Sequence, residues 1–126
     1  MKYRNSIFSF ITILLLGFVL LGDFSYGATE TTVEKILGNK DSYNGKEVSV
    51  SGTVSKIKFR TSKGGNEYTT FSLIGDSGGS VSVNVFVWEH PKIKEGQKVK
   101  VLGIYRKVKK VGRYTFYNEI EAIEIK

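Results

Sequence analysis

The chain has 126 residues, with 19 lysines and arginines against 12 aspartates and glutamates, and it contains no cysteine. Without cysteine there are no disulfide bonds, no thiolate metal sites and no lipid attachment through a processed cysteine. The formal net charge of +7 favours an anionic partner.

Residues 1–27 have the pattern of a secretory signal peptide. Lys2 and Arg4 precede an apolar stretch, residues 7–21, which small residues follow. As a helix this stretch would rise about 22 Å, less than the roughly 30 Å hydrocarbon core of a bilayer. We therefore expect a secreted or periplasmic protein in which residues 28–126 form one domain, with no stable membrane insertion after cleavage. A retained, tilted membrane anchor is the alternative.

The domain is expected to begin with a short helix. Thr31 and Glu34 have the spacing of a capping box, and apolar residues recur at helical spacing before Gly38. Asn44-Gly45 then predicts a turn into a long first strand. The inward row of this strand slips in phase, as a bulge would cause: Val48, Val50, Gly52 and Val54 come first, then Ile57 and Phe59.

Four further strands are expected, each with an inward apolar row at a period of two residues. The rows are Phe71 and Leu73; Val81, Val83, Val85 and Val87; Val99, Val101, Gly103 and Tyr105; and Phe116, Asn118, Ile120 and Ala122, with a second slip to Ile123 and Ile125. Residues 89–97 contain the only proline, Pro91, and predict a loop rather than a helix.

These elements predict an all-β fold, the five-stranded Greek-key barrel called the OB-fold, with a short N-terminal helix. Another small barrel of the SH3-like kind is the alternative. Residues 43–54 (YNGKEVSVSGTV) and 95–99 (EGQKV), with Gly103, resemble the opening and the fourth strand of tRNA-anti-like OB-fold domains. The resemblance covers roughly the whole of residues 28–126 and implies nucleic-acid binding.

Two basic hairpins are expected where an OB-fold clamps its ligand, between the first and second strands and between the fourth and fifth. Nine of the 17 basic residues after residue 27 lie in them, whereas charge that serves only solubility would be scattered. They are Lys56, Lys58, Arg60 and Lys63 in one hairpin, and Arg106, Lys107, Lys109, Lys110 and Arg113 in the other. We expect these side chains to neutralise phosphates. The structural alternative is that edge lysines prevent strand-to-strand aggregation.

Three aromatic residues alternate away from the inward rows, namely Tyr68, Phe86 and Trp88. Exposed rings stack on unpaired bases with about 1 to 3 kcal/mol each. The alternative for each ring is that the N-terminal helix, the 89–97 loop or a partner subunit covers it. We expect Phe86 to be the better platform, because for Trp88, next to the 89–97 loop, the covered alternative is at least as well supported. Tyr114 and Tyr117 flank the second hairpin and are either further platforms or ordinary strand residues.

The sequence does not contain a convincing set of catalytic residues. His90 is the only histidine and has no cysteine partner, so neither a zinc site nor a nucleophile with a histidine base can be assembled. Glu119, Glu121 and Glu124 are expected to be solvated strand-edge residues. We therefore expect a non-enzymatic protein with no metal and no cofactor.

Together these patterns predict an exported nucleic-acid-binding OB-fold module whose ligand is single-stranded DNA or RNA, or another polyanion. The alternative is an envelope interaction module that binds a protein, an anionic polysaccharide or a small ligand. Basic residues alone do not distinguish the two, since any polyanion would attract them.

Overall fold

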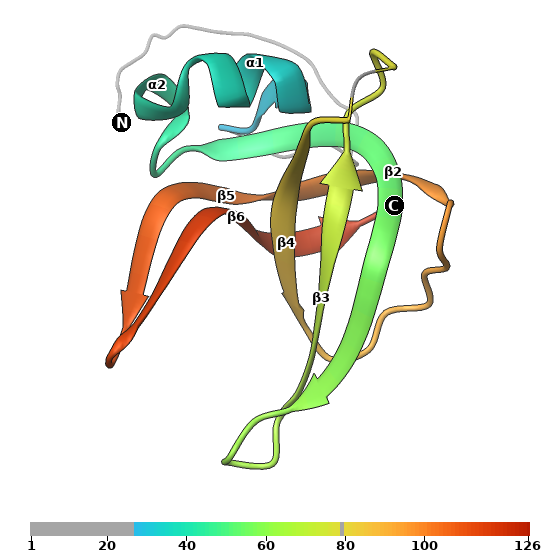
Figure 1. Cartoon of the computed structure of the whole chain (residues 1–126), viewed down its shortest axis with the longest axis vertical. Helices are drawn as coiled ribbons and strands as arrows, with labels where there is room; N and C mark the ends of the chain where they lie inside the picture. The colour runs from blue at the N-terminus through green and yellow to red at the C-terminus, as the bar shows by residue number, and fades with distance from the viewer. Residues whose placement is uncertain (1–26, 79) are drawn as a thin grey trace, which may run out of the picture.

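The computed structural model describes residues 27–78 and 80–126 (Figure 1). The predicted signal peptide lies outside the described residues, apart from Gly27. Among the residues that are described, no helix has the length and apolar character needed to cross a membrane.

Two short helices and six strands make up the described chain. In chain order they are β1 (Thr29–Thr31), α1 (Val33–Gly38), α2 (Lys40–Tyr43), β2 (Glu47–Thr61), β3 (Glu67–Ile74), β4 (Ser82–Trp88), β5 (Lys98–Val111) and β6 (Tyr114–Ile125). As expected, the chain between β4 and β5 forms no helix.

The five long strands close into a ring. They follow the order β2-β3-β4-β6-β5, and β5 pairs back onto β2. The β4–β6 pair is parallel and the other pairs of the ring are antiparallel. This is the five-stranded Greek-key arrangement of an OB-fold, so the predicted fold is confirmed. The short β1 adds to β2 in parallel outside the ring.

Strand β2 bends around the barrel with the help of a glycine and a bulge (Figure 1). A Cβ on Gly52 would lie 2.5 Å from the carbonyl oxygen of Ile74, so no larger residue fits at this corner. The pairing of β2 with β3 then shifts between Ser55 and Lys58, and Lys56 takes a φ of 57°. The glycine and the bulge were both expected from the sequence, and both increase the local bend of β2.

Helix α1 covers one end of the barrel. Val33 and Ile36 on this helix are fully buried in the core. The helix begins one residue later than the predicted capping box, because Thr32 rather than Thr31 caps it by accepting a hydrogen bond from the Lys35 N–H at 3.0 Å. Thr31 instead ends β1.

Most of the predicted apolar rows are buried in the barrel. The buried members are Val48, Val50, Val54, Phe71, Leu73, Val83, Val85, Val99, Val101, Tyr105 and Ile120. Phe59, Phe116 and Ile123 were expected in the same rows but are exposed. Phe59 and Phe116 lie on hairpin extensions beyond the barrel, and Ile123 is the extra residue where the β5–β6 register shifts. Val81 is also exposed, because it precedes β4.

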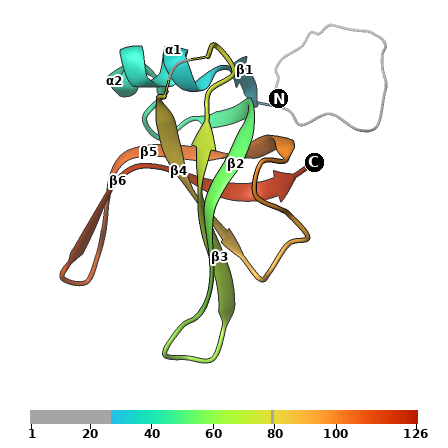
Figure 2. The same cartoon turned by 45° about the vertical axis from the view of Figure 1, so that its right-hand side comes forward.

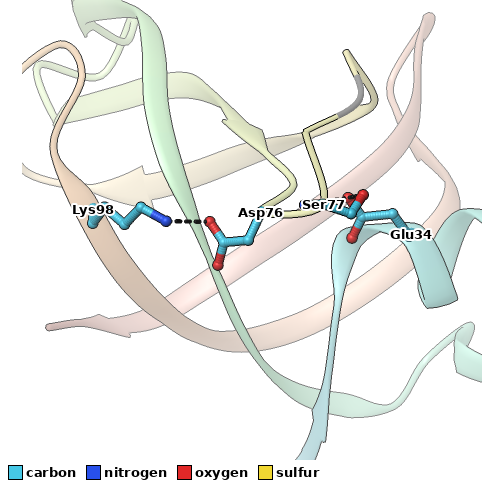
Figure 3. A network of polar contacts seen from close by, with 4 residues as sticks. All are labelled: Glu34, Asp76, Ser77 and Lys98. Carbon is cyan, nitrogen blue, oxygen red and sulfur yellow. Dashed lines mark hydrogen bonds and ion pairs between the residues drawn. The ribbon is translucent and has the colours of Figure 1, made fainter.

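Side-chain hydrogen bonds connect the β3–β4 turn to α1 on one side and to β5 on the other (Figure 3). Ser77 donates its hydroxyl to Glu34 of α1 at 2.5 Å, and Asp76 accepts a hydrogen bond from the Lys98 ammonium at 2.8 Å. Hydrogen bonding by Ser77 is the main reason that the pKa of Glu34 lies below its usual range. The turn therefore joins the helix to the barrel.

The β2–β3 and β5–β6 pairs extend beyond the barrel as two long hairpins. Both tips project away from the helices in two views of the molecule (Figures 1 and 2). Strand β2 continues to Thr61 and β5 to Val111, so most of the basic residues predicted in loops lie on paired strands.

Candidate nucleic-acid interface

Tyr68, Phe86 and Trp88 form one aromatic cluster on the outer face of β3 and β4. The strand register pairs Tyr68 with Trp88 and places Phe86 two residues away on the same face. Tyr68 stacks on Phe86 with ring centroids 5.2 Å apart, and Trp88 meets Phe86 edge-on at 5.0 Å. The three residues predicted to share a face therefore do so, with Val85 and Phe71 buried on the other side.

The order of exposure in this cluster is the reverse of the prediction. Trp88 is 52% exposed, so the following loop does not cover it. Phe86 is half-buried, lies against Tyr68, and has the Lys109 ammonium 4.9 Å from its ring centroid. Trp88 therefore offers the most open ring for stacking.

Lys109 is held in an ion pair rather than presented to solvent. Its Nζ lies 2.6 Å from Oε1 of Glu119, and the two side chains are only 20% and 8% exposed. The prediction that Glu119 is a solvated edge residue is wrong, because Lys109 and Phe86 lie over this part of β6. Since Glu119 compensates its charge, Lys109 is a poor candidate for neutralising a phosphate.

Lys107 is also paired within the protein. Its ammonium lies 2.8 Å from Asp41 of α2, and its backbone N–H donates to Asn44. The hydrogen bond and the positive charge of Lys107 hold the pKa of Asp41 below its usual range. Lys107 therefore forms a surface link between β5 and α2 and contributes less free charge than its type suggests.

The other seven predicted basic residues form no ion pair within 4 Å among the residues that the structure describes. They are Lys56, Lys58, Arg60 and Lys63 on the β2–β3 hairpin, and Arg106, Lys110 and Arg113 on the β5–β6 hairpin. Arg60 is paired with Tyr68 across β2 and β3, while Lys109 reaches Phe86 from β5. Both hairpins thus flank the aromatic cluster.

Two residues of this region, Glu119 and Phe116, are not among the predicted site residues. The sequence around Glu119 does not indicate its ion pair, because its partner Lys109 is brought close only by the bend of the hairpin. Phe116 lies opposite Lys109 in the β5–β6 ladder, and the Lys109 ammonium is 5.8 Å from its ring centroid. The turn at Gly112 and Arg113 fixes this register, so the glycine was the signal that could have identified Phe116.

His90 has a structural role at the start of the β4–β5 connection. Its Nε2 lies 3.1 Å from the carbonyl oxygen of Arg60, and its ring packs edge-on against Phe59 at 5.1 Å. These contacts attach the loop to the β2–β3 hairpin. Within residues 27–78 and 80–126, no group of three or more histidine, cysteine, aspartate or glutamate side chains is placed to hold a metal ion.

The fold is similar to that of a chain in the crystal structure of yeast Stn1 and Ten1, with a TM-score of 0.58 and 15% identity. The similarity covers 80% of this chain, which spans 63% of the length of the yeast chain. The second OB-fold domain of replication protein A from Methanococcus maripaludis matches with a TM-score of 0.39 and 19% identity, over 66% of this chain and 84% of that domain. No protein-family model and no curated protein matches the sequence. The first similarity supports the OB-fold, whereas the finer resemblance to tRNA-anti-like domains stays a prediction.

Proposed function

We propose that this protein is an exported, non-enzymatic OB-fold module that binds single-stranded DNA or RNA. The observation that carries the proposal is the aromatic cluster of Tyr68, Phe86 and Trp88, in which Trp88 is exposed, flanked by two hairpins with unpaired basic side chains. Aromatic rings supply base stacking, and cations along a strand neutralise its phosphates. Few other anionic polymers combine flat apolar rings with a regular array of negative charge.

A single strand suits this face better than a duplex. The rings of Phe86 and Trp88 contact each other edge-on, so they present surfaces in different directions. Bases in a duplex are already stacked on each other and cannot lie on these rings, whereas unpaired bases can. The basic residues alone would attract both forms.

Export is proposed from the signal-peptide pattern of residues 1–27. In a compartment outside the cytoplasm, the same surface would meet extracellular nucleic acid and also anionic polysaccharides. The alternative ligand class, a polysaccharide, shares the charge of a nucleic acid but lacks its flat bases.

The proposal is tested by fluorescence anisotropy with labelled oligonucleotides. We expect the protein to bind a single strand more tightly than a duplex of the same sequence at every salt concentration. Unlabelled single strand should also displace the probe more effectively than an anionic polysaccharide of equal charge density. Equal affinity for the strand, the duplex and the polysaccharide would contradict the proposal and support an interaction module for polyanions in general.

A further inference from the structure

The β5–β6 hairpin has two different faces. Its register pairs Lys109 with Phe116 and Val111 with Tyr114, so these four side chains lie on one face. Tyr117 alternates to the opposite face. Phe116 is 43% exposed, and Tyr114 and Tyr117 are each 61% exposed.

The face that carries Phe116 is joined to the aromatic cluster of the barrel through Lys109. The Lys109 ammonium lies between two rings, 4.9 Å from the centroid of Phe86 and 5.8 Å from that of Phe116. Glu119 holds the ammonium in place at 2.6 Å. A cation between two rings attracts both of them, so the aromatic surface continues from Trp88 and Phe86 across Lys109 to the hairpin.

A basic side chain without an ion pair accompanies the hairpin rings. The Arg113 guanidinium lies 6.0 Å from the ring centroid of Tyr114. Arg113 has no acidic partner within 4 Å among the described residues, whereas Lys110 alternates to the opposite face, the one that carries Tyr117. The hairpin thus offers both components of single-strand recognition, a flat ring and a nearby cation.

We propose that Phe116 and Tyr114 form a second stacking platform, so that the ligand is an extended single strand that crosses both the barrel face and the hairpin. This inference rests on the proposed function and narrows it. A mononucleotide or a very short oligonucleotide would occupy the barrel cluster alone. A longer strand would also place bases on the hairpin, with a phosphate near Arg113.

The experiment is a length series of unlabelled oligothymidylates of about 2 to 16 nucleotides, a range that includes the usual site size of one OB-fold. Competition against one labelled strand gives the affinity of wild type, Phe116→Ala, Phe116→Leu and Tyr117→Ala at each length. Phe116→Leu keeps apolar bulk beside Lys109 but removes the flat ring. Tyr117→Ala is the matched control, because Tyr117 lies on the opposite face and is as exposed as Tyr114.

We expect both Phe116 variants to bind the longest strands about 5- to 150-fold more weakly, which corresponds to the loss of one stacked base. The shortest strands should bind them as well as they bind wild type. Tyr117→Ala should match wild type at every length. Emission from Trp88, the only tryptophan in the sequence, should be unchanged in the free variants if the barrel cluster is intact.

Three results would overturn the inference. Equal weakening at all lengths would mean that Phe116 only supports the barrel cluster through Lys109. Normal binding of long strands by both folded variants would mean that the hairpin is not a platform, while the proposed function would stand. No binding of any single strand by wild type would remove the proposed function and this inference with it.

Discussion

The ammonium of Lys109 lies 2.6 Å from the carboxylate of Glu119, and this ion pair is largely buried between the β5–β6 hairpin and the outer face of the barrel. Regular alternation would place these two side chains on opposite faces of the hairpin. They meet because Asn118 takes a φ of 51° and interrupts the alternation of β6. Tyr105 stabilises this conformation by donating its hydroxyl to Asn118 at 2.7 Å.

Replacing Lys109 is expected to destabilise the fold. Lys109→Gln would leave Glu119 buried without a compensating charge, which should lower the free energy of unfolding by about 3 kcal/mol. Lys110→Gln, next to it but exposed and unpaired, should change the free energy by less than about 0.5 kcal/mol. Urea denaturation of the two variants provides the comparison. Equal losses of unfolding free energy in the two variants would show that the ion pair does not stabilise the packing of the hairpin on the barrel.

Salt dependence should identify which basic residues contact phosphates. If about four to six of the unpaired cations do so, the slope of log affinity against log salt for a single strand should be about −3 to −4. The double variant Lys110→Gln/Arg113→Gln should flatten that slope by about 1.4, since each lost contact contributes about 0.7. Lys107→Gln should change the slope less, because Asp41 already pairs with Lys107. An unchanged slope in the double variant would rule the hairpin out as a phosphate contact.

Substitutions in strand β4 should lower the stability of the fold on its buried face only. Val85 is fully buried, so Val85→Ala should lower the free energy of unfolding by about 1 to 3 kcal/mol through lost burial. Ser82 is exposed at the start of the same strand, and Ser82→Ala should be nearly neutral. Thermal or urea unfolding measures both, and similar losses would contradict the two-faced strand.

Acid should weaken the contact between α1 and the β3–β4 turn. The hydrogen bonds from Ser77 lower the pKa of Glu34 in the folded state, so the ionised carboxylate stabilises the fold above its ordinary pKa of about 4.3. This contribution is lost as the pH falls through the lowered folded-state pKa. Ser77→Ala should therefore be less stable than wild type at neutral pH, and the difference should shrink at acid pH. Ser80→Ala, in the same turn, is the control; a difference for Ser77→Ala that persists unchanged in acid would contradict the role of Glu34.

The barrel was predictable from the sequence because its strands depend on local alternation and on glycines at corners. The rows around Val50, Leu73 and Val85 required only a period of two residues. Which basic residues form ion pairs within the protein was not predictable in this way. Lys107 and Lys109 resemble Lys110 in sequence, yet their partners Asp41 and Glu119 are brought close only by the folded barrel and by the bend at Asn118.

The exposure of the aromatic residues also depended on three-dimensional context. Alternation correctly placed Phe86 and Trp88 on the same face, but it could not show which ring a neighbour covers. Phe86 is partly covered by Tyr68 and by Lys109 from a distant strand, whereas Trp88 at the strand end stays open. Single-strand binding itself stays a proposal that these positions support.

The most direct test of base stacking on the barrel face is the fluorescence of Trp88, the only tryptophan in the chain. We expect unlabelled single-stranded DNA to quench this emission in a saturable titration, with little change on adding an anionic polysaccharide of equal charge density. Trp88→Ala should remain folded, keep the salt slope and bind the strand about 1 to 3 kcal/mol more weakly. Tight binding of a labelled single strand by wild type without any change in Trp88 emission, together with unaltered binding by Trp88→Ala, would contradict the account.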